Sequence, residues 1–259
     1  MMRQMIHALF PLAGIGVQRE AAIWDGLETE IEEAIKIVRP YTMLPAVRLA
    51  SLYRQVVFCE RHEITGCFVE CGVWKGGAVA LMALANLKHG HHRRDLHLFD
   101  AFQDICEPDE AVDGAVAVRE TRKYSKGRMT GRLTPLRGFY DRFGGAGSVS
   151  QNRELLERRV GYDAAYLHYH QGWFQETLPR GASDVGEIAI LRLDSDWYAS
   201  TKVCLNSLGP KVVRGGFFIV DDFGTYEGCR RAVEEWIATA NARVFLVPTD
   251  SSCWFWMNV

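Results

Sequence analysis

The chain has 259 residues, enough for one large α/β domain with a substantial apolar core. Apolar residues make up 48% and charged residues 24%, as in an ordinary globular protein, and the formal net charge is -2. This near-neutral balance offers no polyanion-binding surface and argues against a nucleic-acid partner.

The N-terminal residues carry a short apolar stretch from Ile6 to Val17, which Pro11 and two glycines interrupt. The stretch is too short to span a bilayer, and one early arginine without a clear cleavage site makes a weak signal peptide. We expect an N-terminal arm that packs on the body or on another subunit, and no membrane partner.

Two amphipathic helices are predicted next. From Trp24 to Val38 apolar residues recur at helical spacing, and Pro40 ends this segment. A second segment with a broad apolar face opens at Thr42. With the arm, these helices form an expected N-terminal extension, residues 1–62, ahead of an α/β domain at residues 63–259.

The rest of the chain alternates short apolar runs with helical stretches. This alternation predicts a mainly parallel sheet flanked by helices, with the last strand antiparallel. Ligands of open sheets bind beyond the carboxyl ends of the strands, where four of these runs carry polar or acidic residues. The runs are Cys67–Cys71, Leu96–Asp100, Ala165–His168, Ile188–Asp194, Gly216–Asp222, Val244–Val247 and Cys253–Met257.

Residues 103–149 break this alternation. The segment is polar, rich in glycine and arginine, and long for a connection. Connections of this length are usually functional lids or disordered insertions. We interpret the segment as a lid over the active site, with a variable surface insertion as the alternative.

The seven cysteines predict reduced, packed thiols. Their count is odd, no CxxC pair occurs, and most lie inside apolar runs. This usage favours a cytoplasmic protein, and the ligand spacing of a zinc site is missing.

A glycine loop follows the first predicted strand and leads into a helix expected at Ala78–Leu87. Its pattern from Gly72 to Gly77 is G-x-x-x-G-G, which fails the G-x-G-x-x-G fingerprint of dinucleotide sites. Glycines let the backbone approach a ligand closely, and the free N–H groups of the helix favour a carboxylate or phosphate. The loop suits S-adenosylmethionine, with a structural turn as the alternative.

Five residues are expected to contact this cofactor. Asp100, at the end of the second predicted strand, would accept hydrogen bonds from the ribose hydroxyls. The others belong to the first strand and its loop: Glu70, Gly72, Trp74 and Gly76.

Two acidic clusters each follow an apolar strand, Asp194-Ser195-Asp196 and Asp221-Asp222. Carboxylates brought together repel one another unless a cation neutralises them. Oxygen ligands favour a hard ion, Mg²⁺ above all, with Ca²⁺ or Mn²⁺ as alternatives. We predict Asp194, Asp221 and Asp222 as metal ligands and Asp196 as a general base. For any single aspartate, a helix cap or turn is the alternative role.

Four segments, in order, resemble the macrocin O-methyltransferase family: Phe68–Gly77, Gly172–Pro179, Leu191–Thr201 and Gly215–Gly224. The resemblance runs from Thr42 to the C-terminus, although the lid matches poorly. It implies a Rossmann-like class I methyltransferase fold, S-adenosylmethionine and Mg²⁺ as cofactors, and a homo-oligomer. It further implies acceptors that are deoxysugar hydroxyls on macrolide-type or aminocoumarin-type antibiotics.

The predicted function is Mg²⁺-dependent transfer of a methyl group from S-adenosylmethionine to a sugar hydroxyl of a small glycosylated natural product. Metal binding would lower the pKa of the hydroxyl, and Asp196 would take its proton. His168 and His170 are second candidates for the base. Two alternatives stay open: a glycosyltransferase, because Asp194-Ser195-Asp196 is a DxD motif, and a catalytically silent family member.

Overall fold

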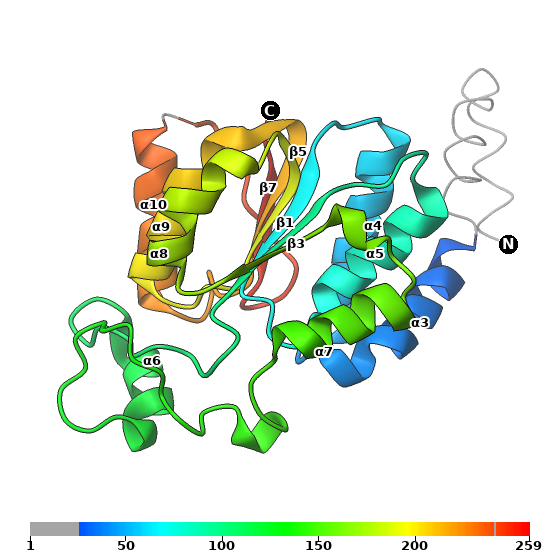
Figure 1. Ribbon diagram of the computed structural model, residues 1–259. Coiled ribbons are helices and arrows are strands. Elements are labelled where there is room, and N and C mark those ends of the chain that lie inside the picture. The colour runs from blue at the N-terminus through cyan, green and yellow to red at the C-terminus, as the bar shows by residue number, and fades with distance from the viewer. Residues whose placement is uncertain (1–25, 241) are drawn as a thin grey trace, which may run out of the picture.

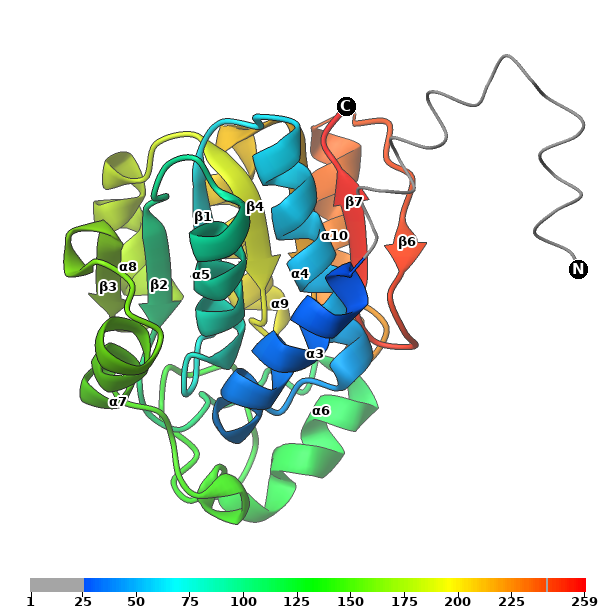
Figure 2. The ribbon, with the colours of Figure 1, turned by 90° about the vertical axis from the view of Figure 1, so that its right-hand side faces the viewer.

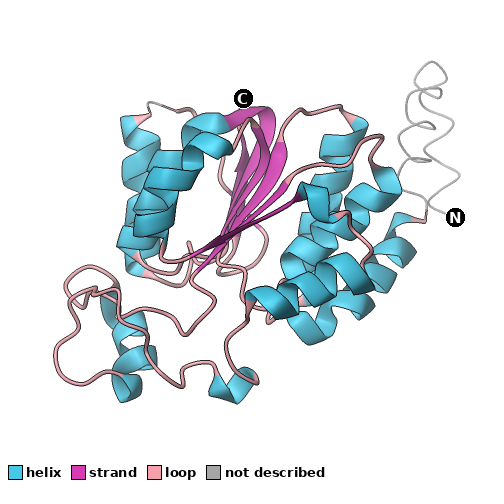
Figure 3. Cartoon of the chain, in the orientation of Figure 1, coloured by secondary structure: helices cyan, strands magenta, loops and turns pink. Residues whose placement is uncertain are grey.

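The computed structural model describes residues 26–240 and 242–259. A seven-stranded sheet lies between two layers of helices (Figures 1 and 3). The strands are β1 (Cys67–Cys71), β2 (Leu96–Asp100), β3 (Leu167–Gln171), β4 (Ile188–Leu193), β5 (Val212–Val220), β6 (Val247–Pro248) and β7 (Trp254–Met257).

The strand order is β3-β2-β1-β4-β5-β7-β6. The pairs among β1 to β5 are parallel, whereas β7 runs antiparallel to both β5 and β6. The predicted α/β architecture with an antiparallel last strand is therefore confirmed. All carboxyl ends of the parallel strands meet at one edge of the sheet.

Three strands differ in extent from the prediction by more than one residue. β3 begins two residues late, because a 3₁₀ turn at Ala164–Tyr166 precedes it and Asp163 caps that turn. β5 begins four residues early, because a register irregularity with Gly215 at φ +84° lets the strand continue through the glycines. β6 has only two residues.

Helices α3 (Leu27–Val38), α4 (Ala46–Arg61) and α5 (Gly77–His89) cover one face of the sheet (Figures 1 and 2). Helices α8 (Phe174–Gly181), α9 (Tyr198–Leu208) and α10 (Glu227–Thr239) cover the other face. The predicted N-terminal arm and Trp24 lie outside the described residues. No helix of residues 26–240 and 242–259 has the length and apolar composition needed to cross a bilayer.

Helix α4 begins at Ala46 rather than at the predicted Thr42. Pro45 occupies the N-cap in an extended conformation, and a proline disfavours the helical region for the residue before it. The short elements are α6 (Gly114–Thr121), α7 (Val149–Arg153), a π-helical segment at Glu154–Arg159, and 3₁₀ turns at Arg39–Tyr41, Arg122–Tyr124, Asp141–Phe143, Ala182–Asp184 and Gly209–Lys211.

The centre of the sheet is buried on both sides. Every residue of β1 and β4 is buried, which explains their nearly continuous apolar sequences. The charged exceptions, Glu70 and Arg192, stand opposite each other in the β1–β4 register. All seven cysteines are buried and free, as the sequence predicted.

Residues 103–149 lie beyond the carboxyl ends of the strands, where α6 stands below the sheet in Figure 1. Trp197 Nε1 donates to the Cys106 carbonyl at 3.0 Å, and Asp113 Oδ1 accepts from the Tyr198 N–H at 2.7 Å. The Tyr226 hydroxyl donates to Glu120 at 2.7 Å. These bonds join the segment to the β4 and β5 ends of the sheet.

Three histidines lie side by side across β2 and β3. The rings of His97 and His168 stack with centroids 4.5 Å apart, and His97 Nδ1 is 3.1 Å from His170 Nε2. Burial, reinforced by these two neighbouring imidazoles, lowers the pKa of His97 to about 4. The folded protein therefore favours a neutral His97 more strongly than the unfolded chain does.

This histidine is expected to make stability depend on pH. Its stabilising contribution is present above the unfolded-state pKa of about 6.5 and is lost as pH falls towards 4. We expect the wild type to lose about 2 kcal/mol more than His97→Phe between pH 7 and pH 5. Urea unfolding at the two pH values measures this difference. The exposed His91→Phe is the control, and an equal pH dependence for wild type and His97→Phe would contradict the prediction.

Candidate active site

Gly72 ends β1 and brings two strand ends together. Its φ is +93°, and a Cβ there would lie 1.8 Å from the carbonyl oxygen of Asp194. Its N–H donates to the Phe99 carbonyl at 2.9 Å. No residue with a side chain fits this position without displacing the start of the acidic loop after β4.

Gly76 makes room for a neighbouring side chain, and its predicted contact with the cofactor stays a prediction. It is the N-cap of α5 with φ +86°, and a Cβ would lie 2.2 Å from Asn152 Oδ1. The missing side chain makes room for Asn152, whose Nδ2 donates to the Trp74 carbonyl at 2.9 Å. Gly76 does not line the cavities described below.

Trp74 adopts a left-handed conformation, with φ +48°. Such strain in a non-glycine residue is held by its surroundings and often marks a functional site. Here the Trp74 N–H donates to Asp100 Oδ2 at 2.8 Å, and Nε1 donates to the Gly145 carbonyl at 3.1 Å. Trp74 therefore joins the glycine loop to residues 103–149, the segment predicted to be a lid.

The Asp100 carboxylate is already engaged by backbone groups. Oδ2 accepts from Val73 and Trp74 at 2.6 and 2.8 Å, and Oδ1 accepts from Phe102 at 2.5 Å. Because a carboxylate has about four lone-pair sites, roughly one is left for a ribose hydroxyl. Asp100 thus fixes the glycine loop in addition to facing the cavity.

Two cavities open at the carboxyl edge of the sheet. The first, here called the cofactor-side cavity, has about 60 Å³ and touches the ends of β1 to β4, between Gly72, Asp100, Gly172 and Asp194. The second, here called the acidic cavity, has about 240 Å³ and lies beside it between Arg48, Trp74 and the acidic residues. The residues that line both cavities are Gly72, Asp100, Ile105, Tyr140, Asp194 and Asp196.

The three predicted metal ligands lie together. One carboxylate oxygen from each of Asp194, Asp221 and Asp222 falls within 4.8 Å of the others. Asp222 Oδ2 is buried and has no hydrogen-bond partner. A small cation bound by oxygen ligands fits this set, since it would supply the counter-charge that the orphaned oxygen lacks.

Asp196 follows β4 by three residues and stands outside this set of three. Its φ of +55° is a left-handed conformation. Burial, together with the charges of Asp194 and Asp221, raises its pKa well above the usual range of a carboxyl group. For the same reasons, burial first and Asp221 second, the pKa of Asp194 is raised to about 6.

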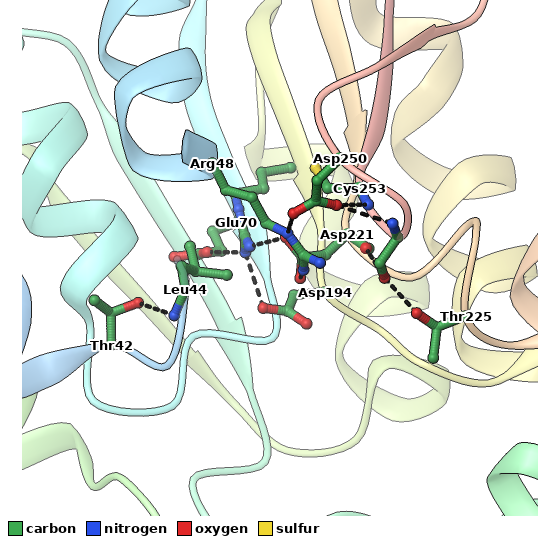
Figure 4. Close-up of polar contacts among 11 residues, drawn as sticks. Thr42, Leu44, Arg48, Glu70, Asp194, Asp221, Thr225, Asp250 and Cys253 are labelled. Carbon is green, nitrogen blue, oxygen red and sulfur yellow. Dashed lines mark hydrogen bonds and ion pairs between the residues drawn. The ribbon is translucent and has the colours of Figure 1, made fainter. Parts of the chain in front are cut away.

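Two arginines partly neutralise the cluster, and the sequence analysis missed both. Arg192 is 2% exposed, and it donates to Glu70 Oε1 at 2.5 Å, Asp194 Oδ2 at 3.1 Å and Asp221 Oδ1 at 2.5 Å. Arg48, from α4, bridges Asp221 and Asp250 at 2.5 and 2.6 Å (Figure 4). Helix α4 therefore contributes a charged side chain directly to this edge of the sheet.

Glu70 lies behind the cavities and does not line them. It is 1% exposed, its Oε2 has no partner, and burial raises its pKa to about 8 despite the nearby Arg192 guanidinium. Its contact with Arg192 places it in the support of the acidic cluster, whereas a direct cofactor contact stays a prediction.

The two alternative bases lie elsewhere. His168 lines a separate, larger cavity of about 990 Å³ around Gly66, and none of the other predicted site residues lines it. His170 stacks on Phe99 at 3.9 Å and does not line the cavities at the carboxyl edge. This geometry favours Asp196 over either histidine.

The strand order and the residues at the strand ends define a class I methyltransferase. A glycine loop follows β1, an aspartate ends β2, and carboxylates follow β4 and β5. Solved methyltransferases share the fold: calicheamicin methyltransferase CalS11 superposes with a TM-score of 0.56 at 18% identity, covering 89% of this chain and 92% of that one. The profile of the macrocin O-methyltransferase family matches residues 35–130 and 148–258. The chain belongs to this family and is an S-adenosylmethionine-type O-methyltransferase.

Several relatives match over most of their length. The demethyldecarbamoylnovobiocin O-methyltransferase of Streptomyces niveus is 31% identical over 220 residues, 84% of this chain and 76% of that protein. The mycinamicin III 3''-O-methyltransferase of Micromonospora griseorubida is 30% identical, with 85% and 82% covered. The solved O-methyltransferase NovP is 29% identical with a TM-score of 0.67, covering 85% of this chain and 82% of that one. Family membership excludes the glycosyltransferase reading of the DxD motif.

Proposed function

We propose that this enzyme transfers a methyl group from S-adenosylmethionine to a sugar hydroxyl of a glycosylated natural product, in a reaction that requires Mg²⁺. The main support for this proposal is the set of three aspartates next to the cofactor-side cavity, in which Asp222 has a buried carboxylate oxygen without a hydrogen-bond partner. Relatives named for novobiocin, rhamnosyl-tetracenomycin and mycinamicin derivatives support a glycosylated acceptor.

Asp194, Asp221 and Asp222 would hold the ion. When bound, S-adenosylmethionine supplies an electrophilic methyl group and Mg²⁺ supplies Lewis acidity towards the acceptor hydroxyl. Arg48 and Arg192 hold Asp221 between them, so this ligand is oriented before an ion arrives. Gly72 and Asp100 shape the turn that would face the cofactor.

Asp196 lines both cavities, which supports the proposal that it acts where the two substrates would meet. As the acceptor oxygen forms its bond to the methyl carbon, the carbon–sulfur bond breaks and its electron pair stays on sulfur. The hydroxyl proton passes to the Asp196 carboxylate, so the products are an ether and a neutral thioether. Holding oxygen, carbon and sulfur in line supplies much of the rate.

The experiment combines binding and turnover. S-adenosylhomocysteine is titrated calorimetrically into the protein with Mg²⁺ and with EDTA, and methylation of demethyldecarbamoylnovobiocin and mycinamicin III is followed by mass spectrometry. We expect micromolar binding of S-adenosylhomocysteine, and product with Mg²⁺ but not with EDTA. Asp222→Asn is the matched variant that should lose turnover while it keeps S-adenosylhomocysteine binding.

Two results would contradict separate parts of the proposal. Undiminished turnover in EDTA and in Asp222→Asn would mean that the reaction does not require Mg²⁺. If the protein binds S-adenosylhomocysteine but neither methylates nor binds either glycoside, the proposal of a glycosylated acceptor is overturned.

A further inference from the structure

Tyr140 stands at the junction of the two cavities. It belongs to residues 131–147, which lie between the two parts of the chain that the family profile matches. Of the six residues that line both cavities in the described chain, Tyr140 alone carries a hydroxyl group. The lid thus places one polar donor on the boundary between the cofactor side and the acidic side.

The backbone around Tyr140 is fixed by several hydrogen bonds. Asp104 Oδ1 accepts from the Tyr140 N–H at 3.1 Å, and Asp104 Oδ2 accepts from Gly138 at 2.9 Å. The Tyr140 carbonyl accepts from the N–H groups of Phe143 and Gly145 at 2.8 and 3.0 Å. The backbone that carries this side chain is therefore fixed within residues 103–149, and one of its partners, Asp104, lines the cofactor-side cavity.

A hydrogen-bond donor at the junction would complement the carboxylates around it. The carboxylates around the junction, Asp100, Asp194 and Asp196, only accept hydrogen bonds when ionised. A sugar presents hydroxyls that both donate and accept, so an accepting lone pair of the sugar needs a donor. The phenol of Tyr140 is protonated at neutral pH and can donate, whereas it is unsuited to act as the base.

The aromatic rings beside the junction add a packing surface. The Tyr140 and Trp74 ring centroids are 6.3 Å apart at an interplanar angle of 40°, and both residues line the acidic cavity. Such rings can bury the apolar C–H face of a sugar while its hydroxyls point to polar groups.

We propose that Tyr140 is an acceptor-positioning residue, whose hydroxyl donates a hydrogen bond to the acceptor sugar at the junction and whose ring packs against that sugar. The inference rests on the proposed sugar acceptor. It assigns to the lid the task of aligning the acceptor oxygen with the methyl group, a task distinct from proton removal by Asp196.

The test compares Tyr140→Phe, Tyr140→Ala and a matched control. Tyr124→Phe is the control, because Tyr124 is a lid tyrosine that packs on Phe139 and does not line either of these cavities. Each protein is measured for S-adenosylhomocysteine binding, and for kcat and KM with whichever of demethyldecarbamoylnovobiocin and mycinamicin III the wild type methylates faster.

Tyr140→Phe is expected to lower kcat/KM about 10-fold, with S-adenosylhomocysteine affinity within about twofold of wild type and an unchanged pH profile. Tyr140→Ala should lower kcat/KM further through a higher KM, and Tyr124→Phe should behave as wild type. Wild-type kcat/KM in both Tyr140 variants, or an equal loss of S-adenosylhomocysteine affinity, would overturn the inference. A wild type that neither binds nor methylates either glycoside overturns the sugar acceptor, and this inference with it.

Discussion

Asp196→Asn is expected to lower turnover by roughly 10²–10⁴-fold while the affinity for S-adenosylhomocysteine stays that of the wild type. The change removes the oxygen proposed to take the proton and keeps the size of the side chain. Asparagine also suits the left-handed backbone at this position, where φ is +55°. The loss can therefore be attributed to chemistry rather than to a rearranged loop.

The measurement is a single-turnover rate with saturating S-adenosylmethionine, beside a calorimetric titration of S-adenosylhomocysteine. Asp184→Asn is the control, since Asp184 is exposed and lines the separate cavity at the other end of the sheet. Turnover equal to that of the wild type in Asp196→Asn would remove this residue from the role of base.

Arg192→Met is expected to destabilise the fold by about 3–5 kcal/mol, the range found when one partner of a buried ion pair is removed. The guanidinium is 2% exposed and contacts three carboxylates, Glu70, Asp194 and Asp221. Without this guanidinium, Glu70 Oε1 loses its hydrogen bond, and Glu70 Oε2 already has no partner, so the whole carboxyl group would be unpaired inside the sheet.

Guanidinium chloride unfolding measures this difference. Arg231→Met is the matched control, because Arg231 is exposed on α10 and pairs with Glu235 on the same helix, so its change should stay within about 0.5 kcal/mol. A loss below about 1 kcal/mol for Arg192→Met would mean that the three carboxylates do not depend on this arginine.

The arrangement of the acidic residues was predictable from the sequence. Asp194 and Asp221 directly follow apolar runs, and in a parallel sheet the carboxyl ends of such runs meet at one edge. The order of neighbouring strands brings β4 beside β5, and so the two clusters meet. Local pattern was sufficient here, because the geometry depends only on strand direction and strand ends.

The arginine partners were not predictable in the same way. Arg48 lies 173 residues from Asp221 in the chain, and the helical pattern of α4 does not say which of its polar residues reaches the sheet edge. Arg192 is a charged residue inside an apolar strand, and this breach of the pattern was the available signal.

The predicted boundaries of helices and strands were wrong where a single residue overrides the apolar pattern. Pro45 moves the start of α4, and Gly215 allows β5 to pass an irregularity that apolar periodicity does not reveal. Helix α6 lies within residues 103–149, which lack strong periodicity, so the sequence did not predict this helix. A homo-oligomer and a cytoplasmic location stay predictions of the sequence.

The attachment of residues 131–147 to the glycine loop has a consequence for how this enzyme could be diversified. Lys75 Nζ donates to the carbonyls of Phe143 and Gly144, and Trp74 Nε1 donates to the carbonyl of Gly145. Every amino acid has a backbone carbonyl, so the side chains of residues 131–147 can change without releasing this anchor, except at the glycines that shape it. Gly144 and Gly145 have φ of +79° and +88°, and a Cβ on Gly147 would lie 1.8 Å from the Trp74 carbonyl oxygen. Grafting the corresponding loop of a relative onto this scaffold should redirect acceptor choice and leave S-adenosylmethionine binding intact, which makes the segment a natural starting point for directed evolution.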